Sequence, residues 1–409
     1  MLSPSEPTQE LLRVANDHDS IDGVLPAQIA SPSSTFELEE TMRDVTRNRT
    51  HTVLTGNRTK IDWGLTPSAF ELGIEMRRMP KILEHEASDL VVRVSANVTL
   101  EELQAQLHQK YQRLAIDTVV RDTTVGGLIA TGLSGPLRYG FGSVRDLIIG
   151  ATVVRPDGVR ATTGGRVVKN VAGYDLAKLY TGSYGTLGAI TEAFFRLHSL
   201  PETAHFLLFE VSLHEIRSLS QEILYSQMAP SALEIRDACD GTGLIFGVLL
   251  EGTETSVLER TRSLAMTLAK EPQVLNAAPE WWGVLPDATT FKVTIEVASS
   301  QAFLEQLHEI AESNGQRLLV TGSIGTGAMF VGAPLLEQAP EQEIEALTRQ
   351  IRAAATLAGG SCVVLRAPER VRNLVDVWGP IPALVVMKSI KAQFDPFNLL
   401  APGRFVGGI

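Results

Sequence analysis

The chain is short of cysteine, and this limits the kinds of metal and redox site that it can hold. Its 409 residues include two cysteines, Cys239 and Cys362, and neither belongs to a Cys-x-x-Cys pair. That scarcity argues against a disulfide framework, a structural zinc site and an iron–sulfur cluster held by this chain alone. It also fits a protein that works in a reducing compartment.

Basic charge and long apolar runs are scarce as well. The formal net charge is −11 and no segment is rich in lysine and arginine, so binding to nucleic acid is not expected. Residues 1–14 lack the basic start and apolar core of a signal peptide. The longest apolar runs, 244–250 and 381–387, are too short to cross a bilayer. We therefore expect a cytoplasmic protein without a direct membrane span, associated with a membrane only through partner subunits.

Glycine, in contrast, is concentrated in one region. Fourteen of the 34 glycines fall between residues 124 and 188. Residues 164–196 read GGRVVKNVAGYDLAKLYTGSYGTLGAITEAFFR, and residues 123–135 read TTVGGLIATGLSG without a charge. Glycine lets the main chain adopt positive φ and approach a ligand without a Cβ in the way. Both segments therefore predict a ligand groove lined by backbone amides.

A third segment has the composition of an anion-binding turn. Residues 52–54 predict a short strand, which runs directly into Thr-Gly-Asn-Arg-Thr-Lys at 55–60. Backbone N–H groups, hydroxyls and two cations after a strand suit a bound phosphate. The spacing is not that of a P-loop, and no Gly-x-Gly-x-x-Gly follows a strand. The dinucleotide-binding fold of dehydrogenases is therefore not supported.

Helix-capping patterns and one domain boundary indicate how the rest of the chain is organised. Capping boxes at 99–102 and 212–215 predict helix starts, and a third start is predicted at Ser256. Residues 200–203 have the composition of a domain boundary. Beyond them, two rounds of strand, helix and strand predict an antiparallel sheet backed by helices.

Several of these segments together resemble one family. Residues 55–60, TVGG at 124–127, KNVAGYDL at 169–176, GSYGTLGAIT at 182–191 and KAQFDP…LAPGR at 391–404 are similar to motifs of the PCMH (vanillyl-alcohol-oxidase) family of FAD-binding flavoproteins. Within it, they most resemble the FAD-binding E-type subunits of glycolate oxidase (glycolate dehydrogenase). The resemblance covers residues 31–203 and about the last twenty.

The resemblance implies an α+β fold. A PCMH-type FAD-binding domain of two α+β subdomains would be followed by a cap domain made of an antiparallel sheet plus helices. On this basis residues 1–30 are an N-terminal extension and residues 31–203 the FAD-binding domain. Residues 204–385 are a cap domain, which forms either a substrate pocket or an interface, and residues 386–409 are a tail that returns to the FAD-binding domain.

The resemblance also implies where FAD binds. The 55–60 loop would surround the pyrophosphate, the TVGG segment and residues 134–135 would lie along the flavin and ribityl chain, and residues 190–191 would border the adenine. No catalytic residue and no metal ligand is assigned. The expected cofactor-binding residues are Thr55, Gly56, Asn57, Arg58, Thr59, Lys60, Thr124, Val125, Gly126, Gly127, Ser134, Gly135, Tyr139, Gly140, Gly182, Gly185, Gly188, Ile190, Thr191 and Arg404.

The chain differs from the family pattern in three ways, and each difference changes what is expected of the FAD site or of catalysis. The 55–60 loop holds no histidine and His51 lies four residues earlier, so FAD is expected to be non-covalent. Ala401 replaces the asparagine of the usual LNPGR tail, which removes one hydrogen bond near Arg404. The related 2-hydroxy-acid dehydrogenases resemble one another in a His-x-His cluster that can hold a metal and accept the substrate proton. Beyond residue 200 this chain has only three unpaired histidines, His205, His214 and His308.

Three functions therefore remain open. The first is an FAD-binding subunit of a multi-subunit glycolate dehydrogenase, in which a sister flavoprotein with the His-x-His site oxidises glycolate to glyoxylate and electrons pass through flavin to an iron–sulfur subunit. The second is a stand-alone FAD-dependent oxidoreductase acting on a small 2-hydroxy acid, with Tyr174, Arg138 and Arg145 as candidate site residues. The third is a non-catalytic structural partner.

Overall fold

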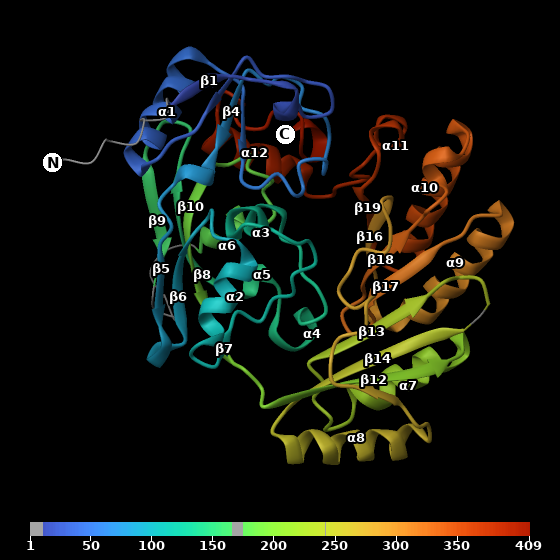
Figure 1. The fold of residues 1–409 in the computed structure, drawn as a ribbon. Coiled ribbons are helices and arrows are strands. Elements are labelled where there is room, and N and C mark those ends of the chain that lie inside the picture. Colours follow the sequence, from blue (N-terminus) through green and yellow to red (C-terminus); the bar gives the residue numbers. More distant parts are fainter. Residues whose placement is uncertain (1–10, 166–174, 242) are drawn as a thin grey trace.

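Two α+β units face each other in the computed structural model (Figure 1). The structure describes residues 11–165, 175–241 and 243–409. Residues 11–200 and the C-terminal tail form the first unit, on the left and top of Figure 1, and residues 203–375 form the second, on the right. The α+β class expected from the sequence is confirmed.

The first unit begins with a four-stranded sheet in the order β1-β2-β4-β3, in which β2 and β3 both run parallel to β4. Its elements are β1 (Leu12–Val14), β2 (Gln28–Ala30), helix α1 (Thr35–Asn48), β3 (Thr52–Thr55) and β4 (Leu72–Glu75). Leu38, Met42 and Val45 recur at helical spacing on α1 and are buried. Since β1 and β2 fall within residues 1–30, the segment predicted as an N-terminal extension contributes two strands to this sheet.

The second sheet of this unit is antiparallel, in the order β5-β6-β10-β8-β9. Its strands are β5 (Leu83–Glu86), β6 (Val91–Ser95), β8 (Ile148–Val154), β9 (Arg160–Gly164) and β10 (Ala189–Arg196). Helices cover one face, and a short pair of strands joins the sheet to the second unit. These elements are α2 (Leu100–His108), α3 (Val125–Thr131), α4 (Arg138–Phe141), α5 (Val144–Leu147), α6 (Ala177–Tyr180), β7 (Gln112–Arg113) and β11 (His198–Ser199).

The second unit is an eight-stranded sheet in the order β15-β12-β14-β13-β17-β18-β16-β19, with every pairing antiparallel. The strands are β12 (Thr203–Val211), β13 (Ala232–Asp237), β14 (Leu244–Gly252), β15 (Gln273–Leu275), β16 (Thr290–Thr294), β17 (Leu319–Ser323), β18 (Ala328–Gly332) and β19 (Ser361–Arg366). Helices α7 (Ile216–Leu224), α8 (Glu254–Leu268), α9 (Ser300–Asn314) and α10 (Glu341–Leu357) cover its outer face (Figure 1). This confirms the predicted antiparallel sheet backed by helices.

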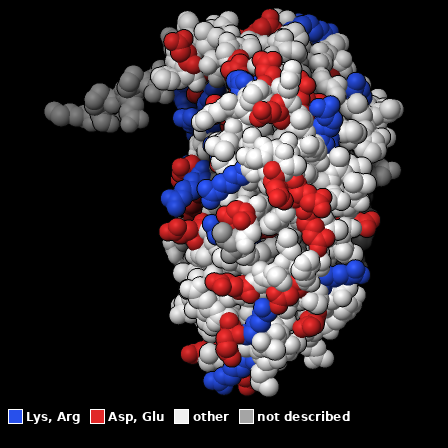
Figure 2. Space-filling view, turned by 90° about the vertical axis from the view of Figure 1, so that its right-hand side faces the viewer, with Lys and Arg blue, Asp and Glu red and all other residues white. Residues whose placement is uncertain are grey.

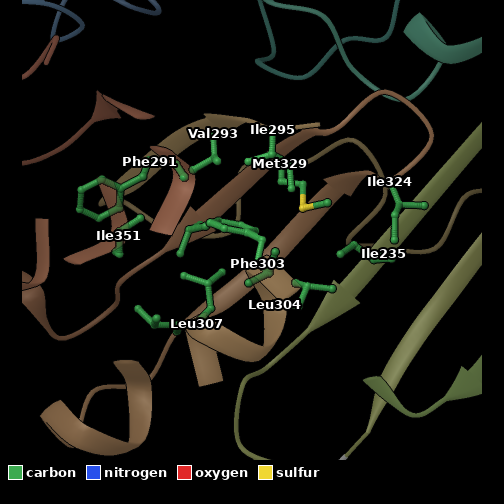
Figure 3. Packing of buried hydrophobic residues seen from close by; sticks show 14 of the residues in the cluster. Ile235, Phe291, Val293, Ile295, Phe303, Leu304, Leu307, Ile324, Met329 and Ile351 are labelled. Carbon is green, nitrogen blue, oxygen red and sulfur yellow. The ribbon is translucent and has the colours of Figure 1, made fainter. Parts of the chain in front are cut away.

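Side chains alternate between the two faces of this sheet, as strand geometry requires. On β13, Leu233 and Ile235 belong to the helix-covered core, whereas Glu234 lines a pocket on the side of the first unit. Figure 3 shows Ile235 beside Phe303 and Leu304 of α9. The outer face is therefore a packed core and the inner face is free to carry polar groups.

A buried ion pair ties the C-terminal helix α12 (Leu384–Phe394) to the first unit. Lys391 Nζ donates to Asp395 Oδ2 at 2.7 Å and to the carbonyl oxygens of Thr186 and Leu400 at 2.9 Å each. Asp395 in turn accepts from the amides of Leu399 and Leu400, at 3.0 and 2.8 Å. We call this the Lys391–Asp395 clamp. It fixes the tail beside the glycine-rich segment.

A second ion pair joins the two units. Arg372, on α11 (Glu369–Leu374), makes a bidentate contact with Asp22 at 2.8 and 2.6 Å. The same guanidinium donates to the carbonyl oxygens of Gly64 and Ala367, at 3.3 and 2.9 Å. Both partners are nearly buried, so the contact fixes the second unit against the N-terminal loops.

The expected helix starts agree with the structure at two of three positions. Capping boxes at Thr99 and Ser212 are present. The start predicted at Ser256 is wrong, because Thr253 is the N-cap of α8 and its hydroxyl accepts from the Ser256 amide at 3.4 Å. The uncharged segment after Asp122 contains helix α3, capped by Thr124, which the sequence did not predict.

The surface and the helices are consistent with the composition. Within the described ranges, no helix has the length and apolarity needed to cross a bilayer. Figure 2 shows acidic and basic side chains interspersed on the face of the second unit that it displays, and that face has no continuous basic area.

Candidate functional site

A long groove in the first unit collects the glycine-rich and anion-binding segments. Its walls come from the loop after β3, the start of α3, the segment before β10 and the C-terminal tail. The residues that line it are Val53, Leu54, Thr55, Gly56, Asn57, Arg58, Thr59, Lys60, Ile61, Met76, Ala96, Thr124, Gly126, Gly127, Ala130, Thr131, Tyr184, Gly185, Gly188, Ala189, Ile190 and Arg404. Segments separated by some 350 residues of chain thus meet at one site.

The 55–60 loop forms one end of the groove, and hydrogen bonds fix its conformation. Asn57 Nδ2 donates to the carbonyl oxygen of Asp122 at 2.9 Å. Arg58 has a left-handed backbone (φ 59°), and its side chain donates to the carbonyl oxygen of Ser20 at 2.7 Å. Lys60 Nζ donates to Thr123 Oγ1 at 3.2 Å. The loop is thus held against the segment that leads into α3.

Gly56 allows this close approach. A Cβ at Gly56 would lie 2.7 Å from Thr124 Oγ1, which is closer than real Cβ atoms come, and 3.3 Å from Thr124 Cγ2, which is a tight contact. Thr124 cannot move away freely because its hydroxyl accepts from the Gly127 amide at 3.2 Å. The position therefore needs glycine for reasons of space.

The opposite wall is the Gly182–Ile190 segment. Tyr184 has a left-handed backbone (φ 55°), its amide donates to the Ala130 carbonyl at 2.9 Å, and its ring stacks on Phe405 with centroids 5.1 Å apart. Gly185 also has positive φ (75°), and a Cβ there would meet nothing within 4 Å. The missing side chain leaves open space on the groove side, as a flat ligand requires.

Arg404 closes the groove from the tail. Its side chain is buried, and Nη2 donates to the carbonyl oxygens of Ile61 and Trp63 at 2.6 and 2.8 Å. Its Nη1 is also buried and finds no hydrogen-bond partner among the described residues. Burial lowers the pKa of Arg404 to about 10, so the guanidinium stays charged at neutral pH.

Seven of the expected cofactor residues lie outside the groove lining. Val125, Gly182 and Thr191 do not line the groove, although neighbouring residues do. The Thr191 hydroxyl donates to the Thr152 carbonyl at 3.0 Å. Tyr139 and Gly140 lie on α4 against the second unit, where a Cβ at Gly140 would make a tight contact of 3.0 Å with the carbonyl oxygen of Ser231. The other two, Ser134 and Gly135, line a different pocket, and residues 169–174 of the KNVAGYDL motif, including Tyr174, lie outside the described residues.

Several residues that line the groove were not predicted from the sequence. Tyr184 was inside a predicted motif but was not singled out, although it is the aromatic member of that wall. Met76, Ala96 and Ala130 come from elements with no local ligand signature. The sequence signal for Tyr184 is its place between Gly182 and Gly185, both of which have positive φ in the structure.

The second pocket lies between the two units, and we call it the interdomain pocket. It is lined by Ser134, Gly135, Pro136, Arg138, Glu234, Gly283, Val284, Lys292, Thr321, Gly322, Ser323, Thr326, Ala328, Met329 and Phe330. Burial raises the pKa of Glu234, and the nearby Asp117 raises it further. Burial lowers the pKa of Lys292, and Arg138 lowers it further. The pocket is therefore lined by two basic side chains, Arg138 and Lys292, and by a buried carboxyl that favours its neutral form.

The groove has the features that FAD needs. A diphosphate requires convergent N–H groups and cations, which the 55–60 loop, Lys60 and the free Nη1 of Arg404 offer. An isoalloxazine or adenine ring requires a wall without protruding side chains, which Gly185 provides. The residues present thus fit the cofactor.

Residues 26–164 match the family described as "FAD binding domain". This part of the chain is an FAD-binding domain, and FAD is its cofactor. The resemblance found in the sequence is thereby confirmed. Whether the individual lining residues contact FAD remains a prediction.

Relatives of known name agree with this assignment. The chain is 33% identical over 222 residues to glycolate oxidase subunit GlcE of Escherichia coli (strain K12), covering 54% of this chain and 61% of that protein. It is 32% identical over 218 residues to glycolate oxidase subunit GlcD of Bacillus subtilis (strain 168), covering 52% of this chain and 46% of that protein. The matched regions thus span less than two thirds of either relative.

A solved structure of alkyldihydroxyacetonephosphate synthase shares the fold. The TM-score is 0.69 at 19% identity, with 93% of this chain and 78% of that chain covered. The match covers 93% of this chain, so that protein shares the fold of both units.

The charge of Lys60 is expected to make FAD binding depend on pH. Burial lowers its pKa to about 7, and within the described residues no carboxylate forms an ion pair with it. Bound diphosphate would favour the charged form and raise that pKa, so the complex would hold a proton that the free chain loses above pH 7. FAD affinity is therefore expected to fall as pH rises above about 7, by up to about tenfold per pH unit.

Titrating FAD into the cofactor-free chain at several pH values checks this. Lys60→Met should weaken binding at low pH and flatten the pH dependence, whereas Lys110→Met, at an exposed position, should preserve it. An affinity that stays constant between about pH 7 and 9 in the unaltered chain would contradict the role given to Lys60.

Proposed function

We propose that this chain is the FAD-binding subunit of a multi-subunit glycolate dehydrogenase. In that complex glycolate is oxidised to glyoxylate by a sister flavoprotein, and electrons pass through flavin to an iron–sulfur subunit. Bound FAD supplies an acceptor for two electrons. The observation that carries the proposal is the groove, whose glycine walls and Arg404 fit FAD, together with the similarity to GlcE and GlcD.

The histidines support a role in which another subunit removes the substrate proton. Removing the proton of a 2-hydroxyl requires a base within hydrogen-bond reach. His205 contacts Thr261 at 3.2 Å, His214 has an exposed side chain, and His308 pairs with Asp237 at 2.7 Å. None of the three lines the groove or the interdomain pocket in the described part of the chain.

The cysteines support an iron–sulfur centre in another chain. Cys362 is buried on β19, and Cys239 lies just after the end of β13. Three strands separate β13 from β19 in the sheet. An iron–sulfur cluster needs several converging thiolates. Two separated thiols cannot supply them, and electrons that leave this flavin would have to reach a cluster on a partner.

A second candidate function is favoured by the interdomain pocket. Thr131 of the groove and Ser134 of the pocket are three residues apart along the chain, so a small acid in the pocket would lie near bound flavin. Arg138 and Lys292 could hold its carboxylate, and Glu234 offers a polar contact to its hydroxyl. Arg138, a candidate from the sequence, lines this pocket; Arg145 is exposed on α5 and does not. This arrangement suits a stand-alone 2-hydroxy-acid oxidoreductase.

Purifying the chain alone and recording its flavin spectrum separates the possibilities. The proposal expects a yellow protein with FAD that heat or acid releases, whose flavin glycolate does not bleach without oxygen until partner subunits are added. Bleaching by glycolate in the chain alone would overturn the proposal in favour of the stand-alone enzyme. A colourless chain that takes up no added FAD would favour a non-catalytic structural partner.

A further inference from the structure

Three potential metal ligands meet at the end of β13, on the side of the second unit away from the groove. They are the carboxylate of Asp237, the thiol of Cys239 and the imidazole of His308, and their ligand atoms all lie within 4.8 Å of one another. Asp237 ends β13, Cys239 lies in the turn that follows, and His308 is on α9. Neither the FAD groove nor the interdomain pocket uses these residues.

The fold explains how they come together. Leu233, Ile235 and Asp237 share the face of β13 that the helices cover, because strand side chains alternate. Helix α9 lies on that face through Leu304 and Leu307. Figure 3 shows Ile235 beside Leu304. Asp237, two residues further along β13, lies 2.7 Å from His308 of α9 through its Oδ2 atom. His308 follows Leu307 and is therefore at the margin of the packed stripe.

The contacts already hold the group in place. His308 Nε2 lies 2.7 Å from Asp237 Oδ2, and Asp237 Oδ1 accepts from the Cys239 amide at 2.9 Å. The Cys239 backbone is left-handed (φ 48°), and its thiol forms no disulfide. Asp237 is 3% exposed, at a position where the strand pattern would place an apolar side chain. A carboxylate buried in this way needs a charged or metal partner.

We propose that Asp237, Cys239 and His308 bind a zinc-like divalent ion through one oxygen, one sulfur and one nitrogen atom. Zinc binds Cys sulfur at about 2.3 Å and His nitrogen or carboxylate oxygen at about 2.0–2.2 Å, so tetrahedral ligand atoms stand about 3.5 Å apart. The three atoms need only shift by about an ångström to reach that spacing. Magnesium and calcium are disfavoured because they select oxygen ligands. Water would complete the fourth position.

The sequence concealed this site because its ligands come from distant segments. Cys239 has no second cysteine near it, and 69 positions separate it from His308. The expectation that the chain holds no structural zinc depended on cysteine spacing alone, which cannot detect ligands that an α-helix and a strand bring together. The ion would join the end of β13 to α9 and stabilise that part of the second unit.

The test uses the full-length, FAD-loaded chain, freed of metal with a chelator and then given zinc. After gel filtration we expect one zinc per chain, one sulfur neighbour at about 2.3 Å by X-ray absorption, and a melting temperature that rises with free zinc. Cys239→Ser should remove the sulfur neighbour. Cys239→Ser and His308→Gln should each weaken zinc binding by at least about tenfold, the loss seen even for outer partners of metal ligands.

Matched controls are available. Cys362→Ser changes the other cysteine, and His214→Gln changes an exposed histidine of the same unit, so both should keep the zinc and its sulfur neighbour. FAD content should be equal in all variants, so failure of this site does not bear on the proposed function. No retained zinc, or zinc binding by Cys239→Ser and His308→Gln as tight as that of the unaltered chain, would overturn the inference and leave Asp237 and His308 as a hydrogen-bonded pair only.

Discussion

Replacing Arg404 with methionine is expected to raise the dissociation constant of FAD by about 10- to 100-fold. The guanidinium donates through Nη2 to the carbonyl oxygens of Ile61 and Trp63, and its Nη1 is buried without a partner beside the groove. A hydrogen bond from a charged group is worth about 1.5–3 kcal/mol. Methionine removes the hydrogen bond that Nη1 would donate to FAD, and it also removes the contacts that hold the loop after Lys60. Equilibrium titration with FAD measures the effect.

Two matched variants separate charge from packing. Arg404→Lys keeps the charge but cannot reach both carbonyl oxygens and the ligand at once, so it should restore part of the affinity. Arg349→Met removes an exposed arginine of α10 and should leave FAD binding unchanged. If Arg404→Met binds FAD as tightly as the unaltered chain, then Arg404 supports the loop and tail only.

Replacing Lys391 with methionine is expected to lower the free energy of unfolding by about 3–5 kcal/mol. The ammonium group makes three hydrogen bonds in the Lys391–Asp395 clamp, and Asp395 is 1% exposed. Without the lysine, the carboxylate stays buried with no charged partner. Urea denaturation of the FAD-loaded chain, followed by flavin release and by circular dichroism, measures the loss.

A double variant that removes the charges of both Lys391 and Asp395 tests the clamp more directly. Lys391→Met with Asp395→Asn leaves no buried charge and keeps one of the two oxygens that accept from the amides of Leu399 and Leu400, so it should recover part of the lost stability. Lys388→Met, on the same helix but exposed, should change the unfolding free energy by less than about 0.5 kcal/mol. A Lys391→Met chain as stable as this control would show that the clamp does not stabilise the fold.

Local chemistry explains which parts of the site the sequence predicted. The 55–60 loop and the TVGG segment line the groove because their turns depend on neighbouring glycines and hydroxyls, as with Gly56 against Thr124. The Gly182–Ile190 segment was predicted for the same reason. The antiparallel sheet of the second unit was predicted from its two rounds of strand, helix and strand.

Tertiary geometry explains what the sequence did not predict. The chain turns at Gly132 (φ 61°), so Ser134 and Gly135 face the interdomain pocket instead of the groove. The ring of Tyr139 fills the space over Gly325, where a Cβ would come within 2.4 Å of it, so packing places that tyrosine at the domain contact. Such positions depend on how the two units pack against each other, and the spacing of residues along the chain does not reveal this packing.

The tail has a consequence for how the protein is made. The groove needs Thr55 and Lys60 from the start of the chain and Arg404 from its last residues, with the whole second unit between them. N-terminal segments leave the ribosome first and fold while the rest is still being synthesised. The cofactor pocket is therefore incomplete until the segment that carries Arg404 has been synthesised, after the whole second unit, and FAD is expected to bind only once that segment has joined the first unit.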